Sequence, residues 1–498
     1  MKQFIFILMF LAVNPVSSQT MLAEIFTNNM VLQRDKPIKI WGKGVPGEKL
    51  QVSFLNETAQ TSVKSDATWQ IVLKKQQAIT KPQTLVVKSS EEKIILTNIL
   101  VGDVWLLIGQ SNMEWPMQAE MHYKEAKKEA ENPNLRFFNP TYIGKNIYGT
   151  PYDKDQLKSL SNNILFQESE WEESDSSSFG DMSAVGYYFG REIVNAENIP
   201  IGLINLAIGG APLETFVDLQ TLKQYKQFSP KTKGNWLKND ALPVWIRERG
   251  MQNVGHSQAV NNHAYKPGFA FKTGVKPILK MPIKGILWYQ GESNAQEMAR
   301  VNEYPELQKL LIKDYRKQWR DKNLPFYWVQ LSSIDTTNYD SHFWPEFRNG
   351  QRKLLNELEH VGMAVSSDVG NRNDIHPRNK KAVGKRLARW ALKNEYGKDI
   401  IVSGPLPQKA EYKNGNIIVE FKYTAKGLQT LDEKAVRGFS IDGKTELTGE
   451  IKDKKIIFPS AEKPEYIYYN WQAYTIGNLG NSKGLPASTF KIEVVQSD

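Results

Sequence analysis

The feature that most constrains the fold is a regular alternation between about Gly102 and Gly397. Short apolar runs, typical of buried strands, are followed by longer stretches with helical periodicity. This alternation predicts an α/β fold with a doubly wound, mostly parallel sheet and helices on both faces. The predicted strands are residues 104–108, 201–208, 283–289, 325–331 and 361–366. The predicted helices are residues 184–195, 304–319, 347–359 and 377–394, with Pro377 in the first turn of the last one and Gly397 as its C-terminal cap.

Both ends of the chain have a different pattern. Residues 19–100 and 399–498 contain short segments rich in Val, Ile and Thr, separated by Gly, Asn and Pro, which predicts a β domain at each end. The α/β domain then spans residues 101–398. Two polar stretches inside it, 117–183 and 223–274, are long for simple connections and are predicted to be insertions near the site.

The N-terminus and the composition restrict where the protein works. Lys2, an apolar stretch at residues 4–13 and small residues at 16–18 predict a signal peptide over residues 1–18, too short to span a bilayer. The chain has no cysteine, which excludes disulfides, zinc–thiolate sites and a lipoprotein anchor. The net charge is +10, but no block of like charge indicates nucleic-acid binding. We therefore expect an exported protein, in a bacterial periplasm, with no membrane anchor and no nucleic-acid partner.

Groups useful in acyl transfer follow four of the predicted strands. Ser111 comes after the first strand, Gly210 ends the second, and Asn294 follows the third in Gln-Gly-Glu-Ser-Asn. The last strand leads to Asp374 and then His376. Because the carboxyl ends of parallel strands share one edge of the sheet, we expect these residues to meet there.

Together these groups predict a serine esterase. Ser111 would be the nucleophile and His376 the base, while a carboxylate orients the imidazole. Asp374 is the nearer choice in sequence and Asp368 the alternative. No metal or organic cofactor is needed. Glu114 and Glu292 are alternative pocket residues, and the remaining histidines are expected on the surface or in packing: His122, His256, His263, His342 and His360.

The same motifs resemble a known family, the sialate O-acetylesterases, within the wider SGNH (GDSL-like) hydrolases. The resemblance covers nearly the whole mature chain. It implies an SGNH-type catalytic domain with an oxyanion hole from the Ser111 N–H, a glycine of the second block and Asn294. The motifs that carry it are Gly-Gln-Ser-Asn-Met at 109–113, Trp-Tyr-Gln-Gly-Glu-Ser-Asn at 288–294 and Asp-Ile-His-Pro at 374–377, with further matches at 29–34, 40–42, Asn478, Asn481 and 484–488.

Two departures from the family pattern leave roles open. The superfamily usually has its Asp three residues before the His, whereas Asp374 lies two before His376, so a backbone carbonyl is a further candidate for orienting the imidazole. In the second block Ala211 stands where we expect Thr. Gly210 is therefore a preference over Gly209 and not an assignment.

The resulting interpretation is a carbohydrate O-acetylesterase acting on O-acetylated sialic acid. An acetylxylan or other plant-glycan acetylesterase is the alternative, and a non-catalytic glycan-binding protein is the alternative of another class. A sialate carboxylate favours an arginine or a lysine near Ser111. Four candidates are not ranked by the sequence: Arg247, Arg249, Arg348 and Arg372. The oligomeric state is not indicated.

Overall fold

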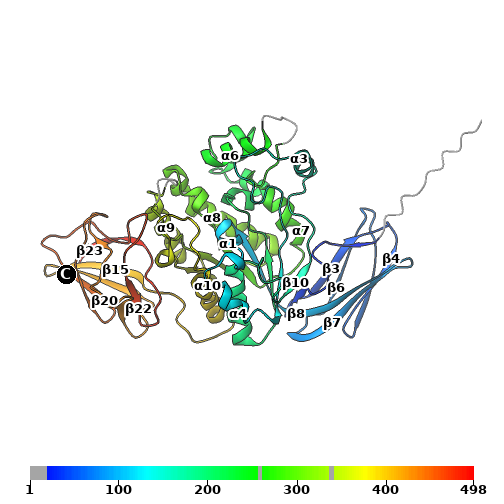
Figure 1. Cartoon of the computed structure of the whole chain (residues 1–498), viewed down its shortest axis with the longest axis horizontal. Coiled ribbons are helices and arrows are strands. Elements are labelled where there is room, and N and C mark those ends of the chain that lie inside the picture. Colours follow the sequence, from blue (N-terminus) through cyan, green and yellow to red (C-terminus); the bar gives the residue numbers. More distant parts are fainter. Residues whose placement is uncertain (1–19, 256–260, 336–340, 498) are drawn as a thin grey trace, which may run out of the picture.

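The computed structural model describes residues 20–255, 261–335 and 341–497. The predicted signal peptide and His256 lie outside these ranges. An α/β body stands in the middle of the molecule, with the N-terminal strands at one end and a C-terminal β module at the other (Figure 1). Within the described ranges, no helix is long and apolar enough to cross a membrane.

The body is built on a mostly parallel sheet, as the alternation predicts. Neighbouring strands run parallel, apart from β10 at one edge, which is antiparallel to β9. The strand order is β10 (Trp171–Ser174), β9 (Asn132–Phe138), β11 (Ile201–Asn205), β8 (Lys93–Gly109), β12 (Gly285–Tyr289), β13 (Phe326–Val329) and β14 (Val361–Ala364). All five predicted strands are present. Two more, β9 and β10, come from the stretch predicted to be an insertion.

Strand β8 joins the N-terminal β region to the sheet. Its first half pairs with β7 (Ile79–Lys88) and β2 (Val31–Gln33), and its second half lies between β11 and β12. The strand therefore runs through residue 100 without a break. Midway along it, the buried carboxylate of Asp103 accepts hydrogen bonds from Gln33 at 2.8 Å and from Arg34 at 2.9 and 3.1 Å. These bonds satisfy a charge inside the apolar interior.

Helices cover both faces of the sheet. On one face α4 (Ala184–Glu197) packs with α10 (Lys380–Asn394), and Trp105 of β8 meets Phe189 of α4 at 4.9 Å between ring centroids. On the other face lie α8 (Met298–Trp319) and α9 (Trp344–Lys353). There the indole of Trp288 donates to the hydroxyl of Tyr304 at 3.2 Å.

Several predicted helix boundaries are wrong, and the helix predicted over 304–319 begins earlier, at Met298. The helix predicted over 347–359 ends at Lys353, and a 3₁₀ turn, Leu354–Asn356, follows it. The helix predicted from Pro377 begins at Lys380, because the Asn379 side chain accepts the Ala382 N–H at 3.1 Å and forms the N-cap. Pro377 thus stays in the loop that carries His376. Gly397 has φ +69° just beyond the end of this helix.

The β regions differ in how they join the body. In the N-terminal region, β3 (Ile38–Lys43) lies between β1 (Met21–Leu22) and β6 (Thr68–Leu73), and β4 (Lys49–Phe54) pairs with β5 (Glu57–Ser62) and β7. Its apolar side chains are continuous with the core of the body. The C-terminal module has a core of its own. Its main sheet is β18 (Phe439–Ser440), β21 (Tyr466–Tyr469), β23 (Phe490–Gln496), β15 (Leu406–Lys413), β16 (Asn416–Lys422), β20 (Lys455–Pro459) and β19 (Glu450–Lys452).

Polar contacts dock the C-terminal module onto the body. The buried guanidinium of Arg348, on α9, donates to the carbonyls of Asn470, Gln472 and Ala473. The amide of Gln330 donates to the Ser488 hydroxyl at 2.9 Å. The module is therefore fixed near the carboxyl ends of β13 and β14.

The end of β8 requires a glycine. Gly109 has φ +134°, and a Cβ there would lie 2.1 Å from the Tyr289 carbonyl oxygen. We expect Gly109→Ala to lower the free energy of unfolding more than Gly397→Ala, measured by urea denaturation. Gly397 has a positive φ but open space around it, so its cost should be only the backbone strain, about 1 kcal/mol. Equal losses in the two variants would contradict the steric argument.

Candidate active site

Ser111 stands directly beyond the end of β8. It is the first residue of α1 (Ser111–Glu114) and is half-buried. The Gln110 carbonyl accepts the N–H groups of Met113 at 2.8 Å and Glu114 at 3.1 Å, which fixes this turn. The Ser111 N–H belongs to the first turn of the helix, where backbone N–H groups have no partner within the helix. It has no hydrogen-bond acceptor among the residues that the structure describes, so it is a donor open to a ligand beside its own hydroxyl.

His376 contacts Ser111 directly. Its Nε2 lies 2.9 Å from the Ser111 Oγ, although the two residues are 265 positions apart. The Trp115 ring stacks on the imidazole, with centroids 5.0 Å apart and an angle of 22°. Burial, helped by the nearby Lys380, lowers the pKa of His376 to about 4, and Asp374 opposes this shift only in part. The imidazole is therefore neutral near pH 7, the form that accepts a proton.

The two candidate acids are separated by the structure. Asp374 Oδ1 lies 3.6 Å from His376 Nδ1 and also accepts the His376 backbone N–H at 2.8 Å. Asp368 faces Arg386 instead, with two contacts of 2.7 Å. Asp374 is thus the carboxylate beside the imidazole.

The two glycines after β11 have different surroundings. The Gly209 N–H donates to the Tyr142 hydroxyl at 2.9 Å. Gly210 has φ +73°, and a Cβ there would lie 2.3 Å from the Tyr265 hydroxyl. Its carbonyl accepts from the Ser293 hydroxyl at 2.9 Å, but its N–H has no hydrogen-bond acceptor among the residues that the structure describes. Of the two N–H groups, that of Gly210 is the one open to a ligand.

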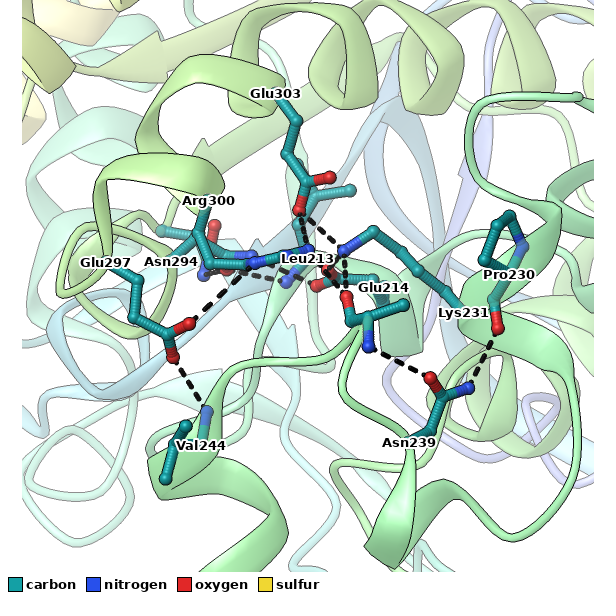
Figure 2. Close-up of polar contacts among 12 residues, drawn as sticks. Leu213, Glu214, Pro230, Lys231, Asn239, Val244, Asn294, Glu297, Arg300 and Glu303 are labelled. Atoms are coloured by element: carbon teal, nitrogen blue, oxygen red, sulfur yellow. Dashed lines mark hydrogen bonds and ion pairs between the residues drawn. The ribbon is translucent and has the colours of Figure 1, made fainter.

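A buried ion pair holds the side chain of Asn294 (Figure 2). The Asn294 Nδ2 donates to Glu214 Oε2 at 3.0 Å, and its Oδ1 accepts the Leu213 N–H at 3.1 Å. Glu214 is fully buried and lies 2.8 Å from the Lys231 ammonium. Burial acts to raise the pKa of Glu214, but Lys231 and the Asn294 amide together lower it below its ordinary value. The ionised Glu214 thereby fixes the amide orientation, and one amide N–H remains for another acceptor.

Asn112 connects the segments that carry Ser111 and His376. Its Nδ2 donates to the Ile375 carbonyl at 3.0 Å and to Glu292 Oε1 at 2.5 Å. Its Oδ1 accepts from the ammonium of Lys380, which is buried and whose pKa burial lowers to about 7. Lys380 was not predicted from the sequence, because a lysine in the first turn of a helix carries no signal of burial. The side-chain amide of Asn112, which follows Ser111, thus holds the segment of Ile375, which precedes His376.

The other polar residues singled out by the sequence have distinct surroundings. Glu114 lies beside Gly209, accepts from the Tyr142 hydroxyl at 3.0 Å, and pairs with Lys145 at 3.3 Å. Burial raises the pKa of Glu114. His263 is buried against Tyr152 and Asn253, His122 lies 3.0 Å from Glu120, and His342 and His360 are exposed.

The chain is similar to known carbohydrate esterases. Residues 269–393, which include Asn294, Asp374 and His376, match a family model described as a carbohydrate esterase, sialic acid-specific acetylesterase. A sialate O-acetylesterase of Mus musculus is 28% identical over 443 residues, covering 80% of this chain and 78% of the mouse protein. That of Homo sapiens is 28% identical over 423 residues, covering 78% and 74%.

A solved structure extends the similarity to the whole architecture. A carbohydrate acetylesterase from Xanthomonas citri superposes with a TM-score of 0.78 at 28% identity, covering 95% of this chain and 99% of that one. The protein is therefore a hydrolase of the carbohydrate esterase class, and the alternative of a non-catalytic glycan-binding protein is set aside. Within that class its animal relatives are sialate O-acetylesterases.

The environment of His376 predicts an unusual pH profile. If His376 accepts the Ser111 proton, kcat/KM should fall only as the pH drops towards about 4, where the imidazole becomes protonated. Lys380→Met removes a positive charge, so the pKa of His376 should rise and the acid limb should move to higher pH. Lys385→Met, on the same helix but paired with Glu192, is the matched control. An acid limb that does not move in Lys380→Met would refute the assigned electrostatic effect.

Proposed function

We propose that this protein removes O-acetyl groups from sialic acid by a serine acyl-enzyme mechanism. The observation that carries the proposal is the 2.9 Å contact between Ser111 Oγ and His376 Nε2 at the carboxyl edge of the parallel sheet. This contact joins a hydroxyl to a neutral base, the pairing that activates a serine. The choice of sialate as the substrate rests on the names of the similar animal proteins.

The proposed reaction has two halves. His376 takes the Ser111 proton while the Oγ attacks the acetyl carbonyl carbon, and it then returns the proton to the departing sugar oxygen. The developing oxyanion is stabilised by the N–H groups of Ser111 and Gly210 and by the free amide N–H of Asn294. A water molecule then gives a proton to His376 and attacks the acetyl carbon of the acetyl-enzyme. The bond to Ser111 Oγ breaks, acetate is released, and His376 returns the proton to the Ser111 oxygen. Asp374 holds the imidazole and stabilises its protonated form.

Several finer assignments belong to the same proposal. The body is taken as an SGNH-type catalytic domain over residues 101–398, between β domains at 19–100 and 399–498. Export through the predicted signal peptide would deliver it to a bacterial periplasm. Acetylated xylan is the competing substrate, and the experiment below includes it.

The nucleophile is tested by Ser111→Ala. We expect this variant to keep its fold, by circular dichroism, and to release no acetate from 9-O-acetyl sialic acid. Ser176→Ala, at an exposed serine, is the control and should match the wild type. Near wild-type turnover by Ser111→Ala would overturn the mechanism. Faster acetate release from acetylated xylan than from sialate would overturn the substrate.

The orienting acid is tested by comparing Asp374→Asn with Asp368→Asn. We expect Asp374→Asn to lower kcat more than tenfold, which corresponds to about 1.4 kcal/mol, because the imidazolium loses its nearest carboxylate. Asp368→Asn breaks only the contact with Arg386, so its kcat should change less than tenfold. A kcat within tenfold of wild type in both variants would mean that no carboxylate orients His376.

A further inference from the structure

We propose that Arg249 forms a carboxylate-binding subsite beside the ester site. This inference rests on the proposed function, because it assigns the group that recognises the acid of a sialate. It singles out one of the four arginines that the sequence leaves unranked.

Helix α6 (Val244–Val254) brings Arg249 close to the two glycines that follow β11, Gly209 and Gly210. Trp245 and Arg249 are four residues apart and therefore lie on one face of this helix. The Trp245 indole donates to the Ser293 carbonyl at 3.1 Å. Its ring also covers Gly210, since a Cβ on that glycine would lie 3.2 Å from it. The face that carries Arg249 is thus seated against the candidate oxyanion hole.

Tyr148 lies between Arg249 and Gly209. The guanidinium lies over the Tyr148 ring, 5.4 Å from its centroid. The Tyr148 hydroxyl in turn reaches Gly209, where a Cβ would lie 2.9 Å from it. Tyr148 is 52% exposed and Arg249 is half-buried, so solvent reaches this position. The Tyr148 ring therefore separates Arg249 from Gly209.

The charge of Arg249 has no counter-ion within the described part of the chain. No carboxylate there forms an ion pair with it, and one terminal nitrogen of its guanidinium is enclosed without an acceptor. A partly enclosed cation without a partner is unfavourable, and a carboxylate is the anion that matches a guanidinium in shape and charge. A bound acid would supply the missing partner.

The other three arginines are already engaged. Arg247 lies 3.0 Å from Asp240, and Arg372 lies 2.6 Å from Asp335. Arg348 donates to backbone carbonyls of the C-terminal module. A ligand acid would have to displace these partners, whereas at Arg249 it displaces none among the described residues.

The placement also suits the shape of the substrate. In a sialic acid the carboxylate and the glycerol chain are attached to the two ring carbons that flank the ring oxygen, and the 9-O-acetyl group lies at the far end of that chain. An acid held in contact with Ser111 would leave the ester out of reach. Arg249 is separated from Gly210 by aromatic side chains, so an acid bound to Arg249 does not occupy the ester site. A neutral acetylated sugar has no group for this position.

The test compares 9-O-acetyl sialic acid with its methyl ester, which lacks the negative charge. We expect the wild type to prefer the free acid by at least about tenfold in kcat/KM, the size of one charged hydrogen bond. Arg249→Gln should reduce this ratio to near one. The loss should appear as a higher KM for the free acid with little change in kcat, because the lost contact is remote from the reacting carbonyl. Arg249→Lys should retain part of the ratio, and Arg247→Gln should retain all of it.

Each contrary result has its own meaning. A preference that persists in Arg249→Gln overturns the subsite but leaves the sialate activity in place. A wild type that hydrolyses the acid and the methyl ester equally overturns the subsite without any variant having to fold. A wild type that releases acetate from acetylated xylan but from neither sialate overturns the subsite and the proposed substrate together.

Discussion

The continuous burial of β8 is the constraint on which the rest of the structure depends. Every residue from Ile99 to Gln110 is buried, and the strand pairs on both edges along most of this length. A strand held in this way has one register, because a shift by one residue would exchange its two faces. The hydrogen bonds from Gln33 and Arg34 to Asp103 fix that register from the N-terminal β region. Contacts made by Gln33 and Arg34, far earlier in the chain, thus help to fix the position of Ser111.

Patterns local to the chain predicted much of this arrangement. The five sheet strands were predictable because buried parallel strands are apolar throughout, and the flanking β regions because their turns are regular. Ser111 and His376 were predictable as a pair because parallel strands end at one edge. The geometry places them 2.9 Å apart.

Features that depend on distant partners were not predictable. Strand β9 contains Arg136, a charged residue whose burial depends on partners elsewhere in the chain, among them the backbone carbonyls of residues 29 and 98 and the carboxylate of Glu173. The choice between the two aspartates depends on Arg386, which lies in a later helix. The pair of Glu214 and Lys231 comes from segments that look solvated in isolation, yet it orients Asn294.

The separate core of the C-terminal module has a consequence for inactivation. Two cores within one chain form two cooperative units, which can lose structure at different temperatures. The loop before His376 rests on this module: Arg372 lies 4.4 Å from the centroid of the Tyr474 ring, and Thr475 donates to the Ser367 carbonyl at 3.1 Å. Melting of the module alone would therefore remove one support of the loop that carries His376, while β8 and Ser111 stay in place. Activity would then fall while most of the chain is still folded.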